Sequence, residues 1–343
     1  MQISHEIISL KLKHTFRTSR EASDWRHNVI CRVRRGEIEG LGEAAPSTFY
    51  GQDTESVSSA LSALTDRLGD DPFALEAITS ELESLFPGEA SARAAVDIAL
   101  HDIVGKKLNA PLYRLLGLDA DQTPLTSVTV GIDSLEMMRK KTEELAQMPI
   151  LKIKLGTEQD EQIIRGIREI SSAVIRVDAN AAWTAEEALE KISRLSEYDI
   201  EFVEQPLAVD DLEGMRWLKK NVQVPIILDE SVRTARDIPR LADCAHGINI
   251  KLMKCGGLRE ALRMIHVARA HDLRVMLGCM VESSVAITAA AQISPLVDYA
   301  DLDGHLLIDN DPFCGIDVVD GKLCLPERPG IGVVDISQVE EGR

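Results

Sequence analysis

Short apolar, β-branched runs recur along the chain from about residue 125 onward, and their starts lie 22 to 27 residues apart. Each gap holds a charged stretch with apolar residues at helical spacing, such as TAEEALEKISRLSEY. The runs are SVTVGI at 127, ILKIKLG at 150, VIRVDAN at 174, IEFVEQP at 200, PIILDES at 225, GINIKLM at 247, RVMLGCM at 274 and YADLDG at 299. Strands that alternate with helices at this spacing predict βαβ units and a parallel sheet.

A repeat of roughly 25 residues also occurs in leucine-rich solenoids. These runs lack the L-x-x-L-x-L signature, and they carry charged residues at their C-terminal ends. A closed barrel explains both features, because α/β barrels keep their active-site residues at that end of the strands. We therefore predict an α/β fold with a TIM-type (β/α)-barrel over residues 121–310.

The first 120 residues follow a different pattern. Two strand-like stretches, 3–16 and 28–44, flank a polar loop from Arg17 to His27. Three stretches with helical spacing come next, at 54–69, 74–86 and 90–108. Strands followed by helices predict a separate N-terminal α+β capping domain over residues 1–120. Residues 311–343 are rich in turn formers, and we expect this segment to pack back on the capping domain and complete it.

Composition narrows the class of protein. The formal net charge of −18 disfavours nucleic acid as a partner, because nucleic-acid-binding surfaces are basic. The six cysteines form no C-x-x-C pair and are expected to be free thiols in a reducing compartment. The N-terminus does not resemble a signal peptide, and no apolar run approaches the ~18–20 residues of a membrane span. We therefore expect a cytoplasmic protein without a membrane partner.

Acidic residues end three consecutive predicted strands, namely Asp178, Glu204 and Asp229. Three carboxylates placed this close would raise one another's pKa values unless a cation joined them. A site with only oxygen ligands suits a hard metal, Mg²⁺ before Ca²⁺. The alternative is that each acid caps a helix or pairs with a basic neighbour. The placement of all three in phase with the repeat favours a Mg²⁺ site.

Lysines end other strands of the same repeat. Lys152 and Lys154 are two residues apart, so both side chains point to one face of their strand. Their mutual repulsion and a nearby metal are expected to lower their pKa values, as a proton-abstracting lysine requires. Lys251 ends a strand on the far side of the three acidic strands, which allows proton removal on one face and return on the other. Lys254, three residues later, is expected in a loop with Gly256 and Gly257 and is a weaker candidate.

LKIKLG, RVDAN, VEQP, LDES and NIKLMKCGG together resemble the motifs of the muconate-cycloisomerase branch of the enolase superfamily. The resemblance covers essentially the whole chain. It implies that the three acids bind Mg²⁺, that Lys154 and Lys251 form the acid/base pair, and that Lys152 tunes or orients them. DLDG resembles the D-x-D motif with which dipeptide epimerases of this superfamily hold the substrate's α-ammonium. Asp301 and Asp303 would then bind a dipeptide, and paired carboxylates suit an ammonium group.

The same resemblance bears on specificity. In relatives that act on alanyl-glutamate, an arginine of the capping-domain loop receives the glutamate carboxylate, and Glu21 is aligned with that position. Asp24 follows on the same loop, and the two acids predict a preference for cationic dipeptides. Arg20 and Arg26 flank them, so either could instead face the pocket and restore glutamate specificity. Met280, at the end of the seventh strand, is a further candidate for the pocket lining.

Three classes of function remain open on the sequence. The first is a dipeptide epimerase that transfers a proton at the α-carbon of the C-terminal residue, including an L-Ala-D/L-Glu epimerase. The second is a cycloisomerase or an o-succinylbenzoate synthase, whose substrates have no ammonium for Asp301 and Asp303. The third is a non-catalytic metal- or peptide-binding barrel, which would not need opposed lysines. A homo-oligomer is a further open alternative for the assembly.

Overall fold

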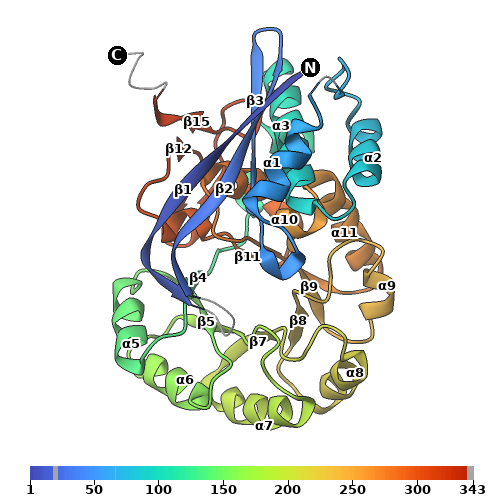
Figure 1. Cartoon of the computed structure of the whole chain (residues 1–343). Coiled ribbons are helices and arrows are strands. Elements are labelled where there is room, and N and C mark those ends of the chain that lie inside the picture. Colours follow the sequence, from blue (N-terminus) through green and yellow to red (C-terminus); the bar gives the residue numbers. More distant parts are fainter. Residues whose placement is uncertain (18–21, 66, 338–343) are drawn as a thin grey trace.

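The computed structural model describes residues 1–17, 22–65 and 67–337. Its N-terminal part is an antiparallel sheet of order β1-β2-β3, formed by Gln2–Arg17, Ala22–Arg35 and Ile38–Ala44 (Figure 1). The expectation of one strand over 28–44 was wrong, because the chain reverses at Gly36, whose φ of 62° suits a tight turn. The expected loop is also shorter than predicted, because Phe16 pairs with Ser23 and Arg17 with Ala22.

Three helices accompany this sheet, α1 (Thr54–Ser62), α2 (Leu75–Leu85) and α3 (Ala90–Lys107). Helix α3 lies against β3 so closely that a Cβ atom built on Gly42 would come within 1.8 Å of the carbonyl oxygen of Ala95. The small residues of α3 permit this approach, and nearly all of the helix is buried. The short helix α4 (Leu112–Leu115) leads into the second part of the chain.

Eight parallel strands form the second part, in the order of the chain. They are β4 (Val128–Val130), β5 (Ile150–Lys154), β6 (Val174–Asp178), β7 (Ile200–Glu204), β8 (Ile226–Leu228), β9 (Gly247–Lys251), β10 (Arg274–Gly278) and β11 (Tyr299–Asp301). A bond from the amide of Ser127 to the carbonyl of Ala300, 3.1 Å long, joins the first strand to the last. The predicted closed barrel and its eight strands are confirmed.

Helices cover the outside of the barrel (Figure 1). They are α5 (Leu135–Glu144), α6 (Asp160–Arg168), α7 (Ala185–Leu195), α8 (Leu212–Asn221), α9 (Ile238–Leu241), α10 (Leu252–Cys255), α11 (Leu258–Ala270) and α12 (Ser284–Ala291). Between β11 and β15, the described chain contains no α-helix.

The barrel interior is filled by side chains rather than open. Arg176 of β6 lies between two rings, with its guanidinium carbon 5.3 Å from the centre of Phe202 and 5.1 Å from that of Tyr299. Its Nε also donates to Glu201 at 2.7 Å. Cation–π contacts and an ion pair therefore satisfy this buried charge within the barrel.

The C-terminal segment contains four short strands, β12 (Phe313–Cys314), β13 (Asp317–Val319), β14 (Lys322–Cys324) and β15 (Val334–Asp335). It contacts the N-terminal part, because Ile331 donates its amide to Asp102 of α3 at 2.9 Å and Asp335 pairs with Arg32 of β2 at 3.0 Å. It also contacts the barrel, where the amide of Ile316 donates to Thr288 of α12.

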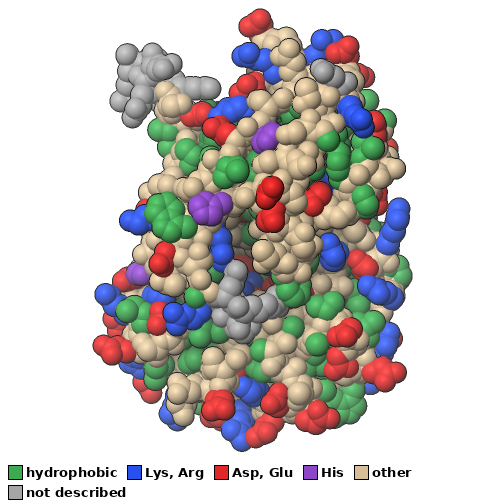
Figure 2. All heavy atoms as spheres, viewed as in Figure 1, with side chains coloured by type: hydrophobic (Ala, Val, Ile, Leu, Met, Phe, Trp, Pro, Cys, Tyr) green, Lys and Arg blue, Asp and Glu red, His purple; other side chains and the backbone are tan. Residues whose placement is uncertain are grey.

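The surface bears charges of both signs. Figure 2 shows acidic and basic side chains interspersed over the face it presents, with no basic patch. None of the helices in the described ranges is long and apolar enough to cross a membrane.

Candidate active site

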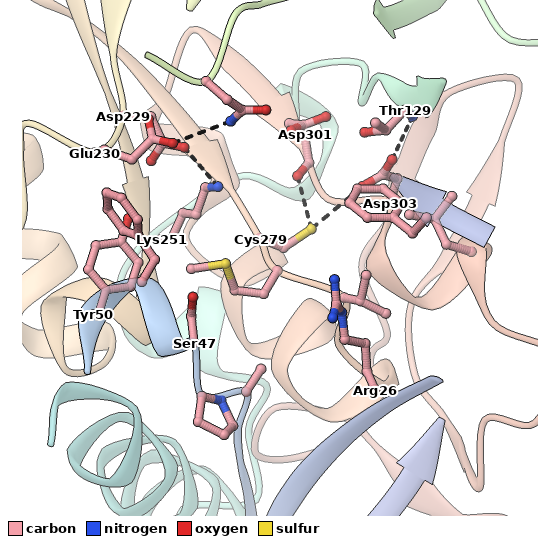
Figure 3. A pocket seen from close by; sticks show the side chains of 18 of the residues that line it. Arg26, Ser47, Tyr50, Thr129, Asp229, Glu230, Lys251, Cys279, Asp301 and Asp303 are labelled. Carbon is pink, nitrogen blue, oxygen red and sulfur yellow. Dashed lines mark hydrogen bonds and ion pairs between the residues drawn. The ribbon is translucent and has the colours of Figure 1, made fainter. Parts of the chain in front are cut away.

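A cavity of about 450 Å³ lies where the C-terminal ends of the barrel strands meet the N-terminal sheet. The barrel contributes charged side chains from four strands or the residues just after them, and the capping part contributes Phe16, Arg26, Asn28 and the stretch 45–50 (Figure 3). Lys152, Lys154, Lys251, Asp229, Asp301, Asp303 and Met280 all line it. The cavity therefore combines residues from both ends of the chain.

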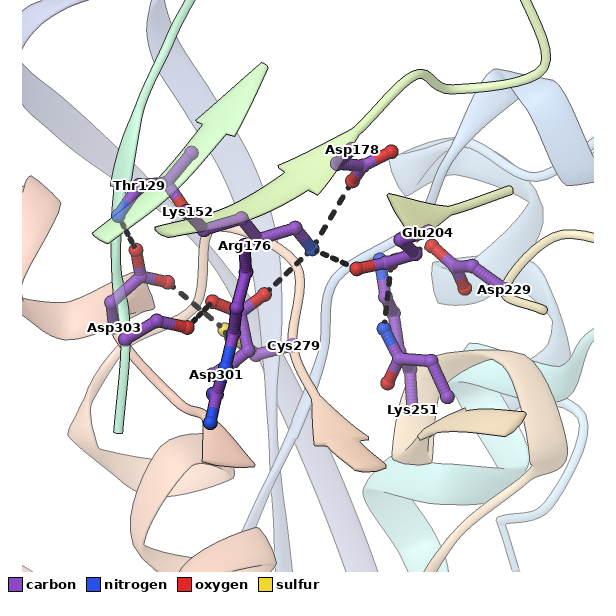
Figure 4. A network of polar contacts seen from close by, with 12 residues as sticks. Thr129, Lys152, Arg176, Asp178, Glu204, Asp229, Lys251, Cys279, Asp301 and Asp303 are labelled. Atoms are coloured by element: carbon purple, nitrogen blue, oxygen red, sulfur yellow. Dashed lines mark hydrogen bonds and ion pairs between the residues drawn. The ribbon is translucent and has the colours of Figure 1, made fainter. Parts of the chain in front are cut away.

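The three acids of consecutive strands lie deep in this site and are almost completely inaccessible to solvent. The Lys152 ammonium lies among the carboxylates, as Figure 4 shows. Its Nζ is 2.8 Å from Asp301, 2.8 Å from Glu204 and 3.1 Å from Asp178. One lysine therefore links three carboxylates that come from β6, β7 and β11.

Lys154 and Lys251 reach the cavity from opposite sides of the acid-bearing strands. The Nζ of Lys154 is 2.5 Å from Asp178 on one side, and the Nζ of Lys251 is 2.9 Å from Asp229 on the other. Both lysines are at least nine-tenths buried and both line the cavity. A molecule between them would meet one ammonium group on each face.

For Lys152, the expected lowering of the pKa is not found in this structure, where carboxylates surround the ammonium group. Burial lowers the pKa of the Lys152 ammonium, but the carboxylates of Asp301, Glu204 and Asp178 outweigh it and raise that pKa well above its usual value. Asp229 likewise raises the pKa of Lys251 against the effect of burial. The expectation rested on repulsion between Lys152 and Lys154 and on a nearby metal, and it left out the carboxylates that Lys152 contacts.

The pKa values of the acids are shifted in opposite directions. Burial would raise the pKa of Asp229, but Lys251 and Lys254 hold it well below its usual value. Burial and the neighbouring Asp178 raise the pKa of Glu204 to about 8. Negative charge is therefore compensated at Asp229 and incompletely compensated at Glu204, and further positive charge would be favourable there.

The three acids form a donor set whose chemistry suits a hard metal. Asp178, Glu204 and Asp229 offer only oxygen ligands from adjacent strands, which suits Mg²⁺. Among residues 1–17, 22–65 and 67–337, no three His, Cys, Asp or Glu side chains are arranged to hold a metal ion together. The carboxylate oxygens instead contact lysine ammonium groups. The chemistry of the donors fits Mg²⁺, and the ion would compete with these lysines for the same oxygens.

Asp301 and Asp303 lie together on the far side of the cavity from Asp229 (Figure 3). The hydroxyl of Ser127 donates to Asp301 at 2.7 Å, and the amide of Thr129 donates to Asp303 at 2.6 Å. Burial and the neighbouring Asp301 raise the pKa of Asp303 to about 6. Asp301 is already paired with the Lys152 ammonium at 2.8 Å. Asp303 accepts instead from the neutral amide of Thr129 and the thiol of Cys279, so a further cation is favourable beside Asp303.

The loop residues considered for specificity lie in different places, and only one of those described lines the cavity. Arg26 lines the cavity, and Figure 3 places it on the same side as Asp303. Asp24 is exposed, accepts a hydrogen bond of 2.6 Å from the hydroxyl of Thr15, and is not part of the cavity lining. Glu21 and Arg20 lie outside the described residues.

Sequence reasoning underestimated Lys254. It was expected in a loop, yet it lies on α10, is 2 % exposed and contacts both the side chain and the main chain of Asp229. Sequence reasoning also missed the contributions of Asn28, Tyr50, Asn180 and Glu230 to the lining. Glu230 directly follows Asp229 and Asn180 follows Asp178 by two residues in RVDAN, so these two had a signal in the sequence, whereas Asn28 and Tyr50 had none.

Two family models match the chain. Residues 3–117 match the N-terminal domain of mandelate racemase and muconate lactonizing enzyme, and residues 136–336 match the enolase C-terminal domain-like family. An L-Ala-D/L-Glu epimerase of Bacteroides thetaiotaomicron is 44 % identical over 329 residues, which cover 95 % of this chain and 86 % of the relative.

Solved structures give the same assignment. A dipeptide epimerase from Cytophaga hutchinsonii, complexed with Mg and D-Ala-L-Val, superposes with a TM-score of 0.93 at 28 % identity, covering 100 % of this chain and 98 % of that one. One from Methylococcus capsulatus, complexed with Mg and L-Arg-D-Lys, gives 0.91 at 34 % identity, covering 97 % and 99 %. Together with the family models, these matches show that the chain belongs to the mandelate racemase and muconate lactonizing enzyme family of the enolase superfamily.

Proposed function

We propose that this protein is a Mg²⁺-dependent dipeptide epimerase, an isomerase that inverts the α-carbon of the C-terminal residue of a dipeptide. The observation that carries the proposal is the approach of Lys154 and Lys251 to one cavity from opposite sides, next to the Asp301–Asp303 pair. Opposed bases serve inversion, and the paired carboxylates serve the free amino terminus of a dipeptide.

Asp178, Glu204 and Asp229 would hold the ion. When bound, Mg²⁺ supplies positive charge that stabilises the negative charge developing on the substrate carboxylate. One of Lys154 and Lys251 removes the α-proton in its neutral form, which requires that it first lose its ion pair with Asp178 or Asp229, and the other, protonated, returns a proton to the opposite face. Lys152 contacts Asp178 and Glu204 at once, so it orients these carboxylates and adds positive charge beside the reacting carbon.

Asp301 and Asp303 distinguish this reaction from a cycloisomerase or an o-succinylbenzoate synthase. Both side chains are 3 % exposed and line the cavity. Lys152 meets Asp301 at 2.8 Å, but burial of the second carboxylate beside it is costly unless a further cation is present, and the α-ammonium of a dipeptide is such a cation. Substrates without an ammonium group would leave this pair without a function.

The side-chain preference has two candidates. Arg26 lines the cavity, and a guanidinium there favours a dipeptide with an acidic side chain, as in alanyl-glutamate. The prediction of a cationic preference depends on Glu21, outside the described residues, and on Asp24, which bonds to Thr15 outside the lining. Arg26 makes the acidic dipeptide the favoured candidate, and the cationic one stays a prediction.

A dipeptide library incubated in D₂O with Mg²⁺ tests the reaction itself. We expect a mass increase of one deuterium in the C-terminal residue of substrates, and formation of both epimers. Asp301→Asn should raise KM for dipeptides, whereas an exposed control such as Glu37→Gln should not. Exchange on acids that lack an ammonium group, with none on dipeptides, would favour the cycloisomerase class instead.

Comparison of alanyl-glutamate with alanyl-lysine tests the side-chain preference. Arg26→Gln is expected to lower kcat/KM for alanyl-glutamate about tenfold or more, because loss of a charged contact costs about 1.5–3 kcal/mol. Alanyl-lysine should be affected little. A wild-type preference for alanyl-lysine would instead support the cationic prediction.

A further inference from the structure

Lys254 is a buried lysine that the proposed reaction does not use. It lies on the single-turn helix α10, directly after β9, and Gly256 ends the turn with a φ of 99°. Its side chain is almost completely inaccessible to solvent, and it is absent from the cavity lining. A substrate in the cavity would therefore not touch it.

The ammonium group of Lys254 donates hydrogen bonds only to Asp229 and to the neighbouring strand β9. Its Nζ donates to Oδ1 of Asp229, to the main-chain oxygen of Asp229 at 2.6 Å and to the main-chain oxygen of Asn249 at 3.0 Å. An ammonium group has three protons, so the three acceptors satisfy it fully. Lys254 thereby ties the end of β8 to β9.

The consequence for Asp229 is that its two oxygens differ. Oδ1 is occupied by Lys254, whereas Oδ2 lies 2.9 Å from Nζ of Lys251, which lines the cavity. The amide of Asp229 also donates to the side-chain oxygen of Gln205 at 3.0 Å. The carboxylate is thus fixed from behind, and one oxygen is presented to the cavity.

We propose that Lys254 is a positioning residue that holds Asp229 so that a single oxygen, Oδ2, is offered to the divalent cation. This inference rests on the proposed role of Asp229 as a metal ligand. Partners that orient a ligand from behind typically account for about 10–100-fold in metal affinity when removed. Lys251 differs in kind, because it faces the cavity and serves the proton transfer.

Direct calorimetric titration of the metal-free protein with MgCl₂ tests the inference. We expect Lys254→Met and Lys254→Gln to weaken Mg²⁺ binding by about 10–100-fold, and saturating Mg²⁺ to restore much of kcat. Lys141→Met is the matched control, because Lys141 is also buried and pairs with an aspartate, Asp133 at 3.0 Å, away from the cavity. It should lower Tm without changing the Mg²⁺ affinity of the folded protein.

Lys254→Gln keeps two donors and the approximate length of the side chain. It is therefore the second variant to test if Lys254→Met does not fold. Unchanged Mg²⁺ affinity in either folded Lys254 variant would overturn the proposal, as would a failure of both to fold, since Lys254 would then serve the fold. Asp229→Asn separates this proposal from the one on which it depends. If Asp229→Asn leaves Mg²⁺ binding unchanged, the metal assignment itself fails. If it abolishes binding while the Lys254 variants bind normally, only the positioning role fails.

Discussion

At the scale of single residues, the site consists of buried charges that neutralise one another. Lys152, Lys154, Lys251 and Lys254 contact the carboxylates that are expected to receive the metal. Breaking one buried pair leaves an uncompensated charge, at a cost of about 3–5 kcal/mol. Substitutions in this site therefore change stability as well as chemistry, and each test needs a measurement of folding beside the measurement of rate.

Lys154 and Lys251 give the most direct test of chemistry. Lys154→Ala and Lys251→Ala should each reduce epimerisation at least about 10³-fold, because inversion needs a proton donor opposite the base. One of the variants should still exchange the α-proton of a single enantiomer with D₂O, which mass spectrometry and chiral chromatography can follow. Thermal unfolding of both variants serves as the control for folding. Near wild-type epimerisation by either folded variant would exclude the two-base assignment.

Glu282 provides a pH-dependent test outside the proposed metal ligands. Burial, followed by the nearby Glu43, raises its pKa to about 8 in the folded protein. The unfolded chain releases this proton near pH 4.5, so stability is lost as the pH rises from there to about 8. Glu282→Gln should therefore have a free energy of unfolding about 2–4 kcal/mol above that of the wild type at pH 8–9, and show little difference at pH 4.

The exposed Glu37→Gln variant is the control for that series and should follow the wild type at every pH. A Glu282→Gln variant that is no more stable at pH 9 than the wild type would show that the buried carboxyl is solvated or paired when ionised. Differential scanning calorimetry at pH 4, 6, 8 and 9 covers the window in which the two curves should separate.

The residue scale also shows what the sequence could not provide. Asp178, Glu204, Asp229 and the three lysines could be identified because each ends a strand in a repeating pattern. Lys254 and Arg26 occupy no such position, and their roles depend on how α10 folds back on β8 and how β2 faces the barrel. Such contacts between distant segments leave no periodic signal in one sequence.

At the scale of elements, the barrel strands were predictable and the first sheet only partly so. Each barrel strand is a short apolar run bounded by helical stretches, so its limits are marked in the sequence. The stretch 28–44 instead has apolar residues on both sides of a charged segment, and Gly36 within that segment marks the turn between β2 and β3. A single glycine inside a strand pattern is also compatible with a bulge, which is why the hairpin was missed.

The contact between β3 and α3 gives an element-scale prediction. A methyl group on Gly42 would overlap the carbonyl oxygen of Ala95, 1.8 Å from the added Cβ. The obstacle is helix backbone, so Gly42→Ala must push α3 away and should destabilise the protein by about 1–3 kcal/mol or more. Gly88→Ala is the matched control, because an added Cβ there would meet no atom within 4 Å. Urea unfolding curves that coincide for the two variants would contradict the close packing.

At the scale of the whole molecule, the cavity exists only because two parts of the chain meet. Phe16, Arg26 and Tyr50 come from the N-terminal part, whereas the acids and lysines come from the barrel. The C-terminal segment contacts both parts, through Asp102 and Arg32 on one side and Thr288 on the other. The geometry of the cavity therefore depends on connections that lie outside its lining.

Asp102 connects α3 to two other parts of the molecule. It is fully buried in α3, and its carboxylate accepts hydrogen bonds from the amides of Leu41 and Ile331, both 2.9 Å long, and from Lys106 at 2.7 Å. One side chain thus joins α3 to β3 and to the C-terminal segment. Asp102→Asn keeps the shape but places an amide where an oxygen must accept these bonds, so we expect a loss of about 2–4 kcal/mol.

The loss should be directional, because the segment that ends at Asp335 would be released first. Limited proteolysis should therefore cut between residues 322 and 337 sooner in Asp102→Asn than in the wild type, before the barrel unfolds in urea. Asp335→Ala is the control, since the pair that Asp335 forms with Arg32 at 3.0 Å lies nearer the surface and its removal should cost below about 1 kcal/mol. Equal proteolysis rates for the two variants would mean that Asp102 does not hold the C-terminal segment. The apolar contacts of the segment with α12 would then be sufficient to hold it in place.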